Sequence, residues 1–437
     1  IDIKEKLENN TTYVFNFGES VVDNNEGNPL PFFNYVFSTG DYIDSLSISG
    51  NIKNSFKREP EEYISTFLYP IDENFSDSII YNGLPNYVGS TLDSTNFKIT
   101  NLKKGKYLLV AIKDENSNYK FDPEFEKISF TSQPINLPTS DSLELKLFKE
   151  TIPFESFKPF IEATNKIGFG FKGFADDVKI KILNHPNIQS ILTKSKETDT
   201  LNYWFKEFEY DSLNFELSTT NYKKNYTLKF KESDKDSLII TSSINSTLEL
   251  NESFKVISNR PLVNVDPEKI KVFNKDSVSV PFDTYIDENQ FDVNFNFEVL
   301  PNDNYIVNIM PNAITDFFES TNDSLSYSFK TKSRADYGTL KLGIRNIQEF
   351  PVIVHLINNK EDIIREIILG SYEDPCLFEN LKPGNYFVRV LFDTNQNGVW
   401  DTGSFLKKIQ PEKTFHYSEE IVIRKNWVLE EKIDLTF

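Results

Sequence analysis

Two copies of one motif decide the fold: "NLKKGKY" at residues 101–107 and "NLKPGNY" at residues 380–386. Both continue without a gap into an Asp- and Asn-rich segment, at residues 114–122 and 393–401. A second pair of copies lies upstream, because residues 13–40 match residues 305–332, again without a gap. Repetition over such lengths indicates that two kinds of structural unit follow one another twice along the chain.

Short runs rich in Val, Ile, Phe, Tyr and Thr surround these motifs, for example "YLLVAI" at 107–112 and "YFVRVLF" at 386–392. Asn, Asp, Gly, Pro and Ser separate such runs roughly every 8–12 residues, which is typical of β-sandwiches. Helical periodicity is nearly absent, and we expect short helical turns at residues 157–162 and 313–318. The sequence therefore predicts an all-β chain of tandem β-sandwiches.

Composition excludes several classes of function. The chain has 66 Asp and Glu against 47 Lys and Arg, a net charge of −19, so broad binding of nucleic acid or another polyanion is not expected. Its one Cys, Cys376, allows no internal disulfide, and we expect a buried thiol in a strand. The three His are far apart in the sequence, and no nucleophile or phosphate-loop motif occurs. We predict that the chain is not an enzyme and holds no cofactor, calcium being the possible exception.

Residues 9–50, "NNTTYVFNF" through "DSLSISG", resemble the end of the bacterial immunoglobulin (Ig)-like domain of surface-layer proteins, in the version found in Bacteroidota envelope lipoproteins. The "NLKxGxY" copies with their Asp/Asn segments resemble carboxypeptidase-regulatory or transthyretin-like domains. The resemblance covers most of the chain and is weakest at 149–250. With the repeats, it implies five domains: the carboxyl-terminal part of an Ig-like domain at 1–44, a transthyretin-like sandwich at 45–148, Ig-like sandwiches at 149–250 and 251–335, and a transthyretin-like sandwich at 336–437.

The same resemblance implies a location. Members of that family carry a signal peptide and a lipidated Cys ahead of the first Ig-like domain, so we expect a lipid anchor upstream of residue 1 and an N-terminally incomplete first domain. They are taken to lie at the outer membrane, exposed at the cell surface. Some resemble subunits of the barrel-assembly machinery or of protein-export translocons. The partners implied are an outer-membrane β-barrel protein and other envelope lipoproteins.

The Asp/Asn segments are the best candidates for a metal site. Oxygen-bearing side chains stand at positions 1, 3, 5 and 9 of the second copy: Asp393, Asn395, Asn397 and Asp401. With Gly398 at position 6 they resemble the start of a calcium loop, although Ser404 replaces the acid expected at position 12. The first copy is weaker, having Tyr119 in place of the glycine: Asp114, Asn116, Asn118 and Asp122. The alternative for both copies is an Asx-rich turn.

A three-residue pattern, Asp followed by Ser or Thr and then by an aliphatic residue or Thr, occurs nine times. It resembles the O-glycosylation sequon of Bacteroidota extracytoplasmic proteins, with these acceptors: Ser45, Ser78, Ser94, Ser142, Thr200, Ser212, Ser237, Ser277 and Ser324. The pattern is equally typical of an Asp-Ser turn that precedes a strand. If the sequon is real, the acceptors must be exposed.

Two functions remain open. The first is a non-catalytic cell-surface lipoprotein that serves as a structural subunit of an outer-membrane complex, with barrel assembly preferred. The alternative is a carbohydrate-binding or adhesin-like surface protein, which predicts a shallow aromatic groove with Trp204 or Trp400 exposed.

In the "NLKxGxY" motif we expect Gly105 and Gly384 to adopt unusual backbone angles and Tyr107 and Tyr386 to bond a neighbouring loop.

Overall fold

The chain folds almost entirely into β-strands. The computed structural model describes residues 3–4, 6–18, 20–30, 33–92, 94–175, 177–206, 211–229, 237–371 and 375–435. Within these ranges the helical elements are the short helix α1 (Ile79–Asn82) and the 3-10 turns η1 (Pro267–Lys269) and η2 (Arg334–Asp336), none of which is long enough to cross a membrane. The prediction of an all-β chain of tandem sandwiches is confirmed.

The two expected helical turns are wrong. Residues 157–162 run into strand β12 (Phe160–Ala163), and residues 313–318 contain strand β27 (Ile314–Asp316). Both segments are short apolar runs, for which periodicity does not separate helix from strand.

Domain 2, the name used here for strands β3–β10, is a sandwich of two sheets. Its strands are β3 (Leu46–Asn54), β4 (Ser65–Pro70), β5 (Tyr87–Ser90), β6 (Asn96–Leu102), β7 (Gly105–Ile112), β8 (Ile128–Phe130), β9 (Ile135–Leu137) and β10 (Ser142–Leu147). One sheet has the order β10-β3-β6, with β10 and β3 parallel. The other has the order β5-β4-β7-β8, and β9 also pairs with β7.

Domain 5, strands β29–β36, repeats this topology. Its strands are β29 (Gly338–Arg345), β30 (Val352–Ile357), β31 (Ile363–Leu369), β32 (Cys376–Leu381), β33 (Gly384–Phe392), β34 (Thr414–His416), β35 (Ile421–Ile423) and β36 (Val428–Asp434). The sheets are β32-β29-β36, with β29 and β36 parallel, and β31-β30-β33-β34, with β35 also on β33. The repeated "NLKxGxY" motif therefore occupies the same turn in both domains, between β6 and β7 and between β32 and β33.

The two copies of this turn are built alike. The Tyr107 hydroxyl donates to the carbonyl of Lys103 at 2.8 Å, and the Tyr386 hydroxyl donates to that of Lys382 at 2.7 Å, so these tyrosines close their own turn. Of the two glycines expected to adopt unusual backbone angles, Gly384 does so, with φ 158°, and Gly105 does not. The left-handed residues of the turn are Asn101 (φ 60°) and Asn380 (φ 52°), in a conformation that Asn tolerates better than most residues.

Domain 3 comprises β11–β18, and its sheets are β11-β13-β16-β15, with β12 also on β13, and β14-β17-β18. Its remaining strands are β11 (Glu155–Ser156), β13 (Lys166–Lys172), β14 (Lys179–Ile182), β15 (Ser190–Lys194), β16 (Thr200–Phe205), β17 (Ser212–Ser218) and β18 (Lys223–Lys229).

Domain 4 comprises β19–β28, with sheets β19-β21-β25-β24 and β20-β28-β26-β23 and the pair β22-β27. Its remaining strands are β19 (Ile240–Ser242), β20 (Thr247–Leu248), β21 (Phe254–Ser258), β22 (Leu262–Val265), β23 (Ile270–Phe273), β24 (Asp283–Ile286), β25 (Asp292–Asn296), β26 (Asn304–Ile309) and β28 (Leu325–Thr331).

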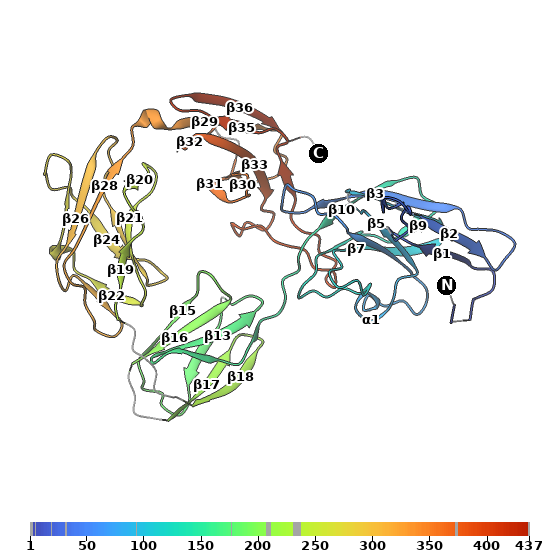
Figure 1. Cartoon of the computed structure of the whole chain (residues 1–437), viewed down its shortest axis with the longest axis horizontal. Coiled ribbons are helices and arrows are strands. Elements are labelled where there is room, and N and C mark those ends of the chain that lie inside the picture. The colour runs from blue at the N-terminus through green and yellow to red at the C-terminus, as the bar shows by residue number, and fades with distance from the viewer. Residues whose placement is uncertain are drawn as a thin grey trace.

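Domain 1 is a single antiparallel hairpin of β1 (Thr12–Asn16) and β2 (Asn34–Ser38). Domains 2 to 5 each enclose a separate apolar cluster between their sheets. Figure 1 shows that the chain curves round, so that the carboxyl-terminal domain 5, drawn in red, returns to the blue and teal domain 2. The fold thus brings together two sister domains that are separated in the sequence by domains 3 and 4.

Candidate functional site

The contact between domains 2 and 5 contains a row of basic side chains that domain 2 itself lacks. His355 in β30 and His416 in β34 both pair directly with Arg389 in β33, so the three side chains lie side by side on one face of the sheet. The equivalent row across β4, β7 and β8 of domain 2 consists of buried apolar side chains: Phe67, Val110 and Phe130. We call His355, Arg389 and His416 the basic row.

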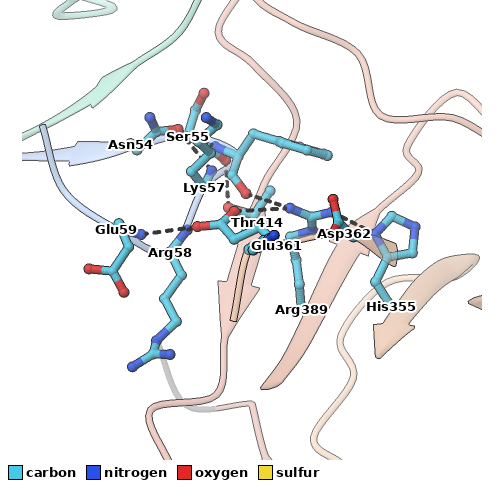
Figure 2. Close-up of polar contacts among 12 residues, drawn as sticks. Asn54, Ser55, Lys57, Arg58, Glu59, His355, Glu361, Asp362, Arg389 and Thr414 are labelled. Carbon is cyan, nitrogen blue, oxygen red and sulfur yellow. Dashed lines mark hydrogen bonds and ion pairs between the residues drawn. The ribbon is translucent and has the colours of Figure 1, made fainter. Parts of the chain in front are cut away.

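Arg389 is the centre of this contact and is 1% exposed. Its guanidinium donates to the carbonyl of Phe56 in domain 2 at 3.2 Å and lies 3.8 Å from the centroid of the Phe56 ring. It also forms an ion pair with Glu361 at 3.6 Å. Figure 2 shows the Arg389 side chain pointing at the segment around Ser55 and Arg58. A buried arginine is thereby paired, hydrogen-bonded and stacked, which offsets the cost of removing its charge from water.

His355 is held in its neutral form. Its Nδ1 accepts hydrogen bonds from Arg389, at 3.3 Å from Nε and 3.0 Å from Nη2, so this nitrogen carries no proton. Its Nε2 then donates to a carboxylate oxygen of Glu366 at 2.9 Å. Burial, and next the Arg389 charge, lower the pKa of His355.

His416, at the other end of the row, is also neutral at pH 7. Burial lowers its pKa to about 4, and the positive charges of Arg389 and Arg58 act in the same direction. Among the described residues neither ring nitrogen has a hydrogen-bond partner. Protonation of either histidine would place a second cation next to buried Arg389, which makes the contact sensitive to acid.

Residues 55–59 of domain 2 lie across this face of domain 5, as Figure 2 shows. Glu361 accepts from the backbone N–H groups of Arg58 at 3.0 Å and of Glu59 at 3.3 Å, and Thr414 donates to the carbonyl of Ser55 at 2.6 Å. The Arg58 guanidinium lies 3.8 Å from the centroid of the Phe387 ring. Each domain therefore places an arginine on a phenylalanine of the other.

Domain 5 in turn fills an apolar surface of domain 2. Phe405 is 0% exposed and belongs to a cluster with Phe67, Val110 and Phe130, its ring 5.2 Å from that of Phe130. Lys408 lies 3.9 Å above the Phe405 ring and pairs with Asp77 of domain 2 at 2.6 Å. The apolar row of domain 2 is thus covered by a side chain of domain 5.

The segment that carries Phe405 is an addition to the shared fold. In domain 2, Glu126 accepts from the backbone N–H groups of Glu115 at 3.2 Å and Asp122 at 2.8 Å. In domain 5, Glu412 accepts in the same way from Thr394 at 2.7 Å and Asp401 at 3.1 Å. Glu412 stands further from Asp401 in the sequence than Glu126 does from Asp122, and Phe405 lies in the extra residues.

The two Asp/Asn segments form loops that close on themselves. In the second copy, Asp393 accepts from the backbone N–H groups of Asn397 at 3.0 Å and Gly398 at 2.8 Å. The side-chain amides of Asn395 and Asn397 donate to Asp401 at 2.6 and 2.7 Å. This is the arrangement of the Asx-turn alternative, because the carboxylates already bind N–H groups.

In the first copy Asp114 accepts from the backbone N–H groups of Asn118 at 3.2 Å and Tyr119 at 3.0 Å, and Asn116 accepts from Asn118 at 3.1 Å. The fourth predicted ligand, Asp122, accepts from Glu124 at 3.0 Å. Within the described ranges, no group of three or more His, Cys, Asp or Glu side chains is placed to hold a metal ion. Calcium at these loops stays a prediction.

The nine predicted glycosylation acceptors differ in accessibility. Six are exposed: Ser45, Ser78, Ser142, Ser237, Ser277 and Ser324. Ser94, Thr200 and Ser212 are half-buried, and the Ser94 hydroxyl donates to the carbonyl of Thr91 at 2.9 Å. Modification of the six exposed residues remains a prediction.

Neither tryptophan proposed for carbohydrate stacking is exposed. Trp204 is 3% exposed, donates to Thr193 at 2.9 Å and packs against Phe291 and Phe318 of domain 4. Trp400 is half-buried, with its ring 4.9 Å from that of Phe56. Both side chains serve contacts between domains, so neither ring is exposed as expected. Trp204 instead lines a cavity of about 460 Å³ with Lys166, Arg260 and Phe318.

Charged contacts also join consecutive domains. Lys172 of domain 3 pairs with Glu124 at 2.7 Å, and Lys196 pairs with Asp292 of domain 4 at 3.1 Å. Buried Glu249 of domain 4 accepts from the Tyr337 hydroxyl at the start of domain 5 at 2.6 Å. Domains 2 to 5 are therefore each in contact with the next, and domain 5 with domain 2.

Sequence reasoning missed the basic row. The signal was present, because Arg389 in "YFVRVLF" and His355 in "VIVHLI" interrupt runs that are otherwise apolar. A charged residue within such a strand indicates a buried polar contact, since buried charges require partners. The partners themselves, Phe56 and Glu361, lie in loops without any motif.

Comparison with known proteins gives only remote similarity to solved structures. No protein-family model and no curated protein matches the chain. Similar solved structures include the major pilin subunit BcpA of Bacillus cereus, 9% identical over 90% of this chain and 99% of that chain, with a TM-score of 0.17. Domains 4–9 of the surface-layer protein SbsC are 6% identical (92% and 65% covered, TM-score 0.21), and the four N-terminal Ig domains of Dscam1 isoform 1.9 are 8% identical (89% and 100% covered, TM-score 0.17). At these values the likeness bears on neither the arrangement of the domains nor the function.

Proposed function

We propose that this protein is a non-catalytic scaffold of the cell surface, whose task is to hold other proteins in a fixed geometry. The observation that carries the proposal is the contact between domains 2 and 5. A string of sandwiches with short linkers is expected to bend at each linker. A contact between its second and fifth members removes that freedom, because the intervening domains are then held at both ends.

The interior chemistry supports a structural role. The histidines with a lowered pKa, His355 and His416, lie between two domains and face arginines, with the His355 pair completed by Glu366. Both lie at the contact with Phe56, and His355 is hydrogen-bonded to Arg389 and Glu366, which is unlike a general base that faces a substrate cleft. Among the described residues, the histidines with a lowered pKa therefore belong to a contact between domains.

The finer assignment follows from the family resemblance of the sequence. The protein would be a lipid-anchored subunit of an outer-membrane complex. The barrel-assembly machinery is the preferred complex, and a protein-export translocon is the second candidate. Such a subunit requires a rigid body that contacts a β-barrel protein and other lipoproteins. A closed set of four sandwiches supplies such a body. The carbohydrate-binding alternative is not favoured, because Trp204 and Trp400 are used inside the molecule.

The test is purification of the tagged protein from membranes in a mild detergent, followed by mass spectrometry of what accompanies it. We expect an outer-membrane β-barrel protein in stoichiometric amount. Phe405→Asp, which places a carboxylate in the apolar cluster of domain 2, should lose this partner, whereas Leu406→Asp at the neighbouring exposed position should keep it. Extraction of the free monomer alone would contradict the scaffold proposal.

A further inference from the structure

The cavity of about 460 Å³ at Trp204 lies where domain 3 meets domain 4, and both domains line it. Domain 3 supplies Lys166 at the start of β13 and Trp204 near the end of β16. Domain 4 supplies Leu238 ahead of β19, Arg260 between β21 and β22, and Phe318 after β27. Cavities of this size at the contact of two domains are typical places for small ligands. This one shares no residue with the basic row.

The charges that face this cavity are positive. Lys166 and Arg260 are among the side chains that line it, and no Asp or Glu of the described ranges is. The chain as a whole has a net charge of −19, with 66 Asp and Glu against 47 Lys and Arg. A lining that reverses the sign of the whole chain favours an anionic ligand.

Arg260 is held in place, and most of its donors are unused. Its side chain is 11% exposed, and its Nη1 donates to Asp316 at 3.1 Å and to Ser320 at 3.5 Å. Asp316 is buried and accepts from the backbone N–H groups of Phe318 at 2.9 Å and of Ser320 at 2.7 Å, so the carboxylate that orients the arginine is itself fixed.

The unused donors of Arg260 have the geometry of a carboxylate site. Among the described residues, neither its Nε nor its Nη2 has a hydrogen-bond partner. A guanidinium holds its five N–H donors in a planar fork, and the parallel N–H groups of Nε and Nη2 match the two oxygens of a carboxylate. A side chain so little exposed, with donors left over, indicates a missing acceptor.

Lys166 adds a second cation from the other domain. Its ammonium pairs at 2.6 Å with Glu162, which does not line the cavity, and lies 4.8 Å from the centroid of the Trp204 ring. An ammonium has three N–H donors, and one carboxylate oxygen occupies one of them. Lys166 can therefore bind a ligand while it keeps its partner.

The rest of the wall is apolar. The rings of Trp204 and Phe318 lie 6.3 Å apart, and the Trp204 indole is fixed by its donation to Thr193 at 2.9 Å. The Arg260 guanidinium lies 5.1 Å from the centroid of the Phe318 ring, so the charged and the aromatic surfaces adjoin. A ligand with its charge at Arg260 therefore places its body against an apolar wall.

We propose that this cavity binds a small organic acid, in which one carboxylate is attached to a compact apolar or aromatic body. The carboxylate accepts from Nε and Nη2 of Arg260 and from the ammonium of Lys166, and the body packs against Phe318 and Leu238. A monoanion fits better than a dianion, because Asp316 and Glu162 already balance the two cations. Since Lys166 and Arg260 belong to different domains, the ligand also ties domain 3 to domain 4.

The first test is isothermal titration calorimetry of the 437-residue chain with two acids, 3-phenylpropionate and hexanoate, and with the neutral amide of each. Acid and amide differ only in the carboxylate, so we expect the better acid to bind at least about tenfold more tightly than its amide. Binding of neither acid, or equal affinity of acid and amide, would overturn the proposal.

Two further probes separate the other anions. Phenyl phosphate keeps an aromatic body but carries a dianion, and glucuronate keeps the carboxylate on a polar sugar. Both should bind more weakly than 3-phenylpropionate. Tighter binding of phenyl phosphate would assign the cavity to phosphate esters, and tighter binding of glucuronate would assign it to acidic sugars, so either result contradicts the proposal.

Variants show whether the acid occupies this cavity. Arg260→Lys keeps the charge but lacks the fork, and Lys166→Met keeps the stem beside Trp204 but lacks the charge, so each should weaken binding by about tenfold. Lys224→Met, at an exposed lysine of domain 3 that does not line the cavity, should leave the affinity unchanged.

The melting temperature of each variant without ligand reports whether it folds. If Arg260→Lys does not fold because Asp316 loses its partner, Lys166→Met alone decides. Unchanged affinity in the folded variants would place the acid elsewhere on the protein and overturn the proposal.

Discussion

Arg389 stands where domain 2 has Val110, and the two histidines stand where it has Phe67 and Phe130. A buried arginine with two neutral imidazoles contributes less to stability than a well-packed apolar row, because each polar group must be removed from water. These polar groups also make the contact depend on geometry, because the Arg389 guanidinium has all its partners only when Phe56 and Glu361 are both in place. The row therefore makes the contact between domains 2 and 5 specific.

The first prediction concerns acid. An unfolded His binds a proton near pH 6.5, whereas folded His416 does so only near 4. Between these values the unfolded state binds the extra proton, so the free energy of unfolding falls as the pH drops from about 6.5 to about 4. The lowered pKa of His355 acts in the same direction.

The variant His416→Phe carries the side chain found at the equivalent position of domain 2 and should lose this share of the pH dependence. Between pH 7 and pH 4, the free energy of unfolding of this variant should fall by on the order of 2–3 kcal/mol less than that of the wild type. Urea unfolding followed by tryptophan fluorescence at both values measures this. A difference between variant and wild type that is the same at both pH values would contradict the assignment.

At the scale of elements, the extra segment between Asp401 and Glu412 joins the domains. Phe405→Ala should lower the free energy of unfolding by about 3–5 kcal/mol, because it leaves a cavity among Phe67, Val110 and Phe130. Leu406→Ala, at a neighbouring side chain that is 63% exposed, should change it by less than about 0.5 kcal/mol. Thermal unfolding of the two variants side by side checks this, and equal effects would show that Phe405 does not fill the cluster.

The Asp/Asn loops give a prediction about metal removal. Because Asp393 and Asp401 already accept hydrogen bonds within the loop, a chelator such as EDTA should leave the melting temperature unchanged. A bound calcium ion would stabilise the folded chain by mass action. A melting temperature that falls with EDTA and recovers with added calcium would establish the calcium loop in place of the Asx turn.

The repeated elements were predictable from sequence, and the contacts between domains were not. The gap-free match of residues 13–40 with 305–332 predicts the shared register of the strand pairs β1-β2 and β26-β28. The "NLKxGxY" motif predicts that its tyrosines are hydrogen-bonded, although their partners lie in the same turn and not in a neighbouring loop. Both depend on residues close together in the chain. The contact of Arg389 with Phe56 depends on residues from different domains, and the local sequence "NSFKRE" at 54–59 contains no pattern that predicts it.

The backbone angles of the same turn were predicted only in part. Gly384 has the expected unusual φ of 158°, but Gly105 does not, and Asn101 and Asn380 take the left-handed conformation. Glycine permits such angles without requiring them. Only the path of the chain from β6 into β7 decides which residue of the turn must take that conformation.

At the scale of the whole molecule, the central claim is that domains 2 to 5 form one closed body. The contacts of residues 55–59 with domain 5 and of Phe405 with domain 2 are reciprocal, so each domain covers an outer sheet face of the other. A scaffold built in this way presents its outer surfaces in a fixed relation to one another, which a string of sandwiches free to bend at each linker would not do.

Single-molecule energy transfer between domains 2 and 5 tests this claim most directly. Dyes are attached at Glu59→Cys and Lys360→Cys, exposed positions beside the bond from the Glu59 N–H to Glu361, in a Cys376→Ala background. The closed body predicts one narrow population of high transfer efficiency, which Phe405→Asp shifts to lower efficiency. A broad distribution at low efficiency in the otherwise unchanged chain would contradict it.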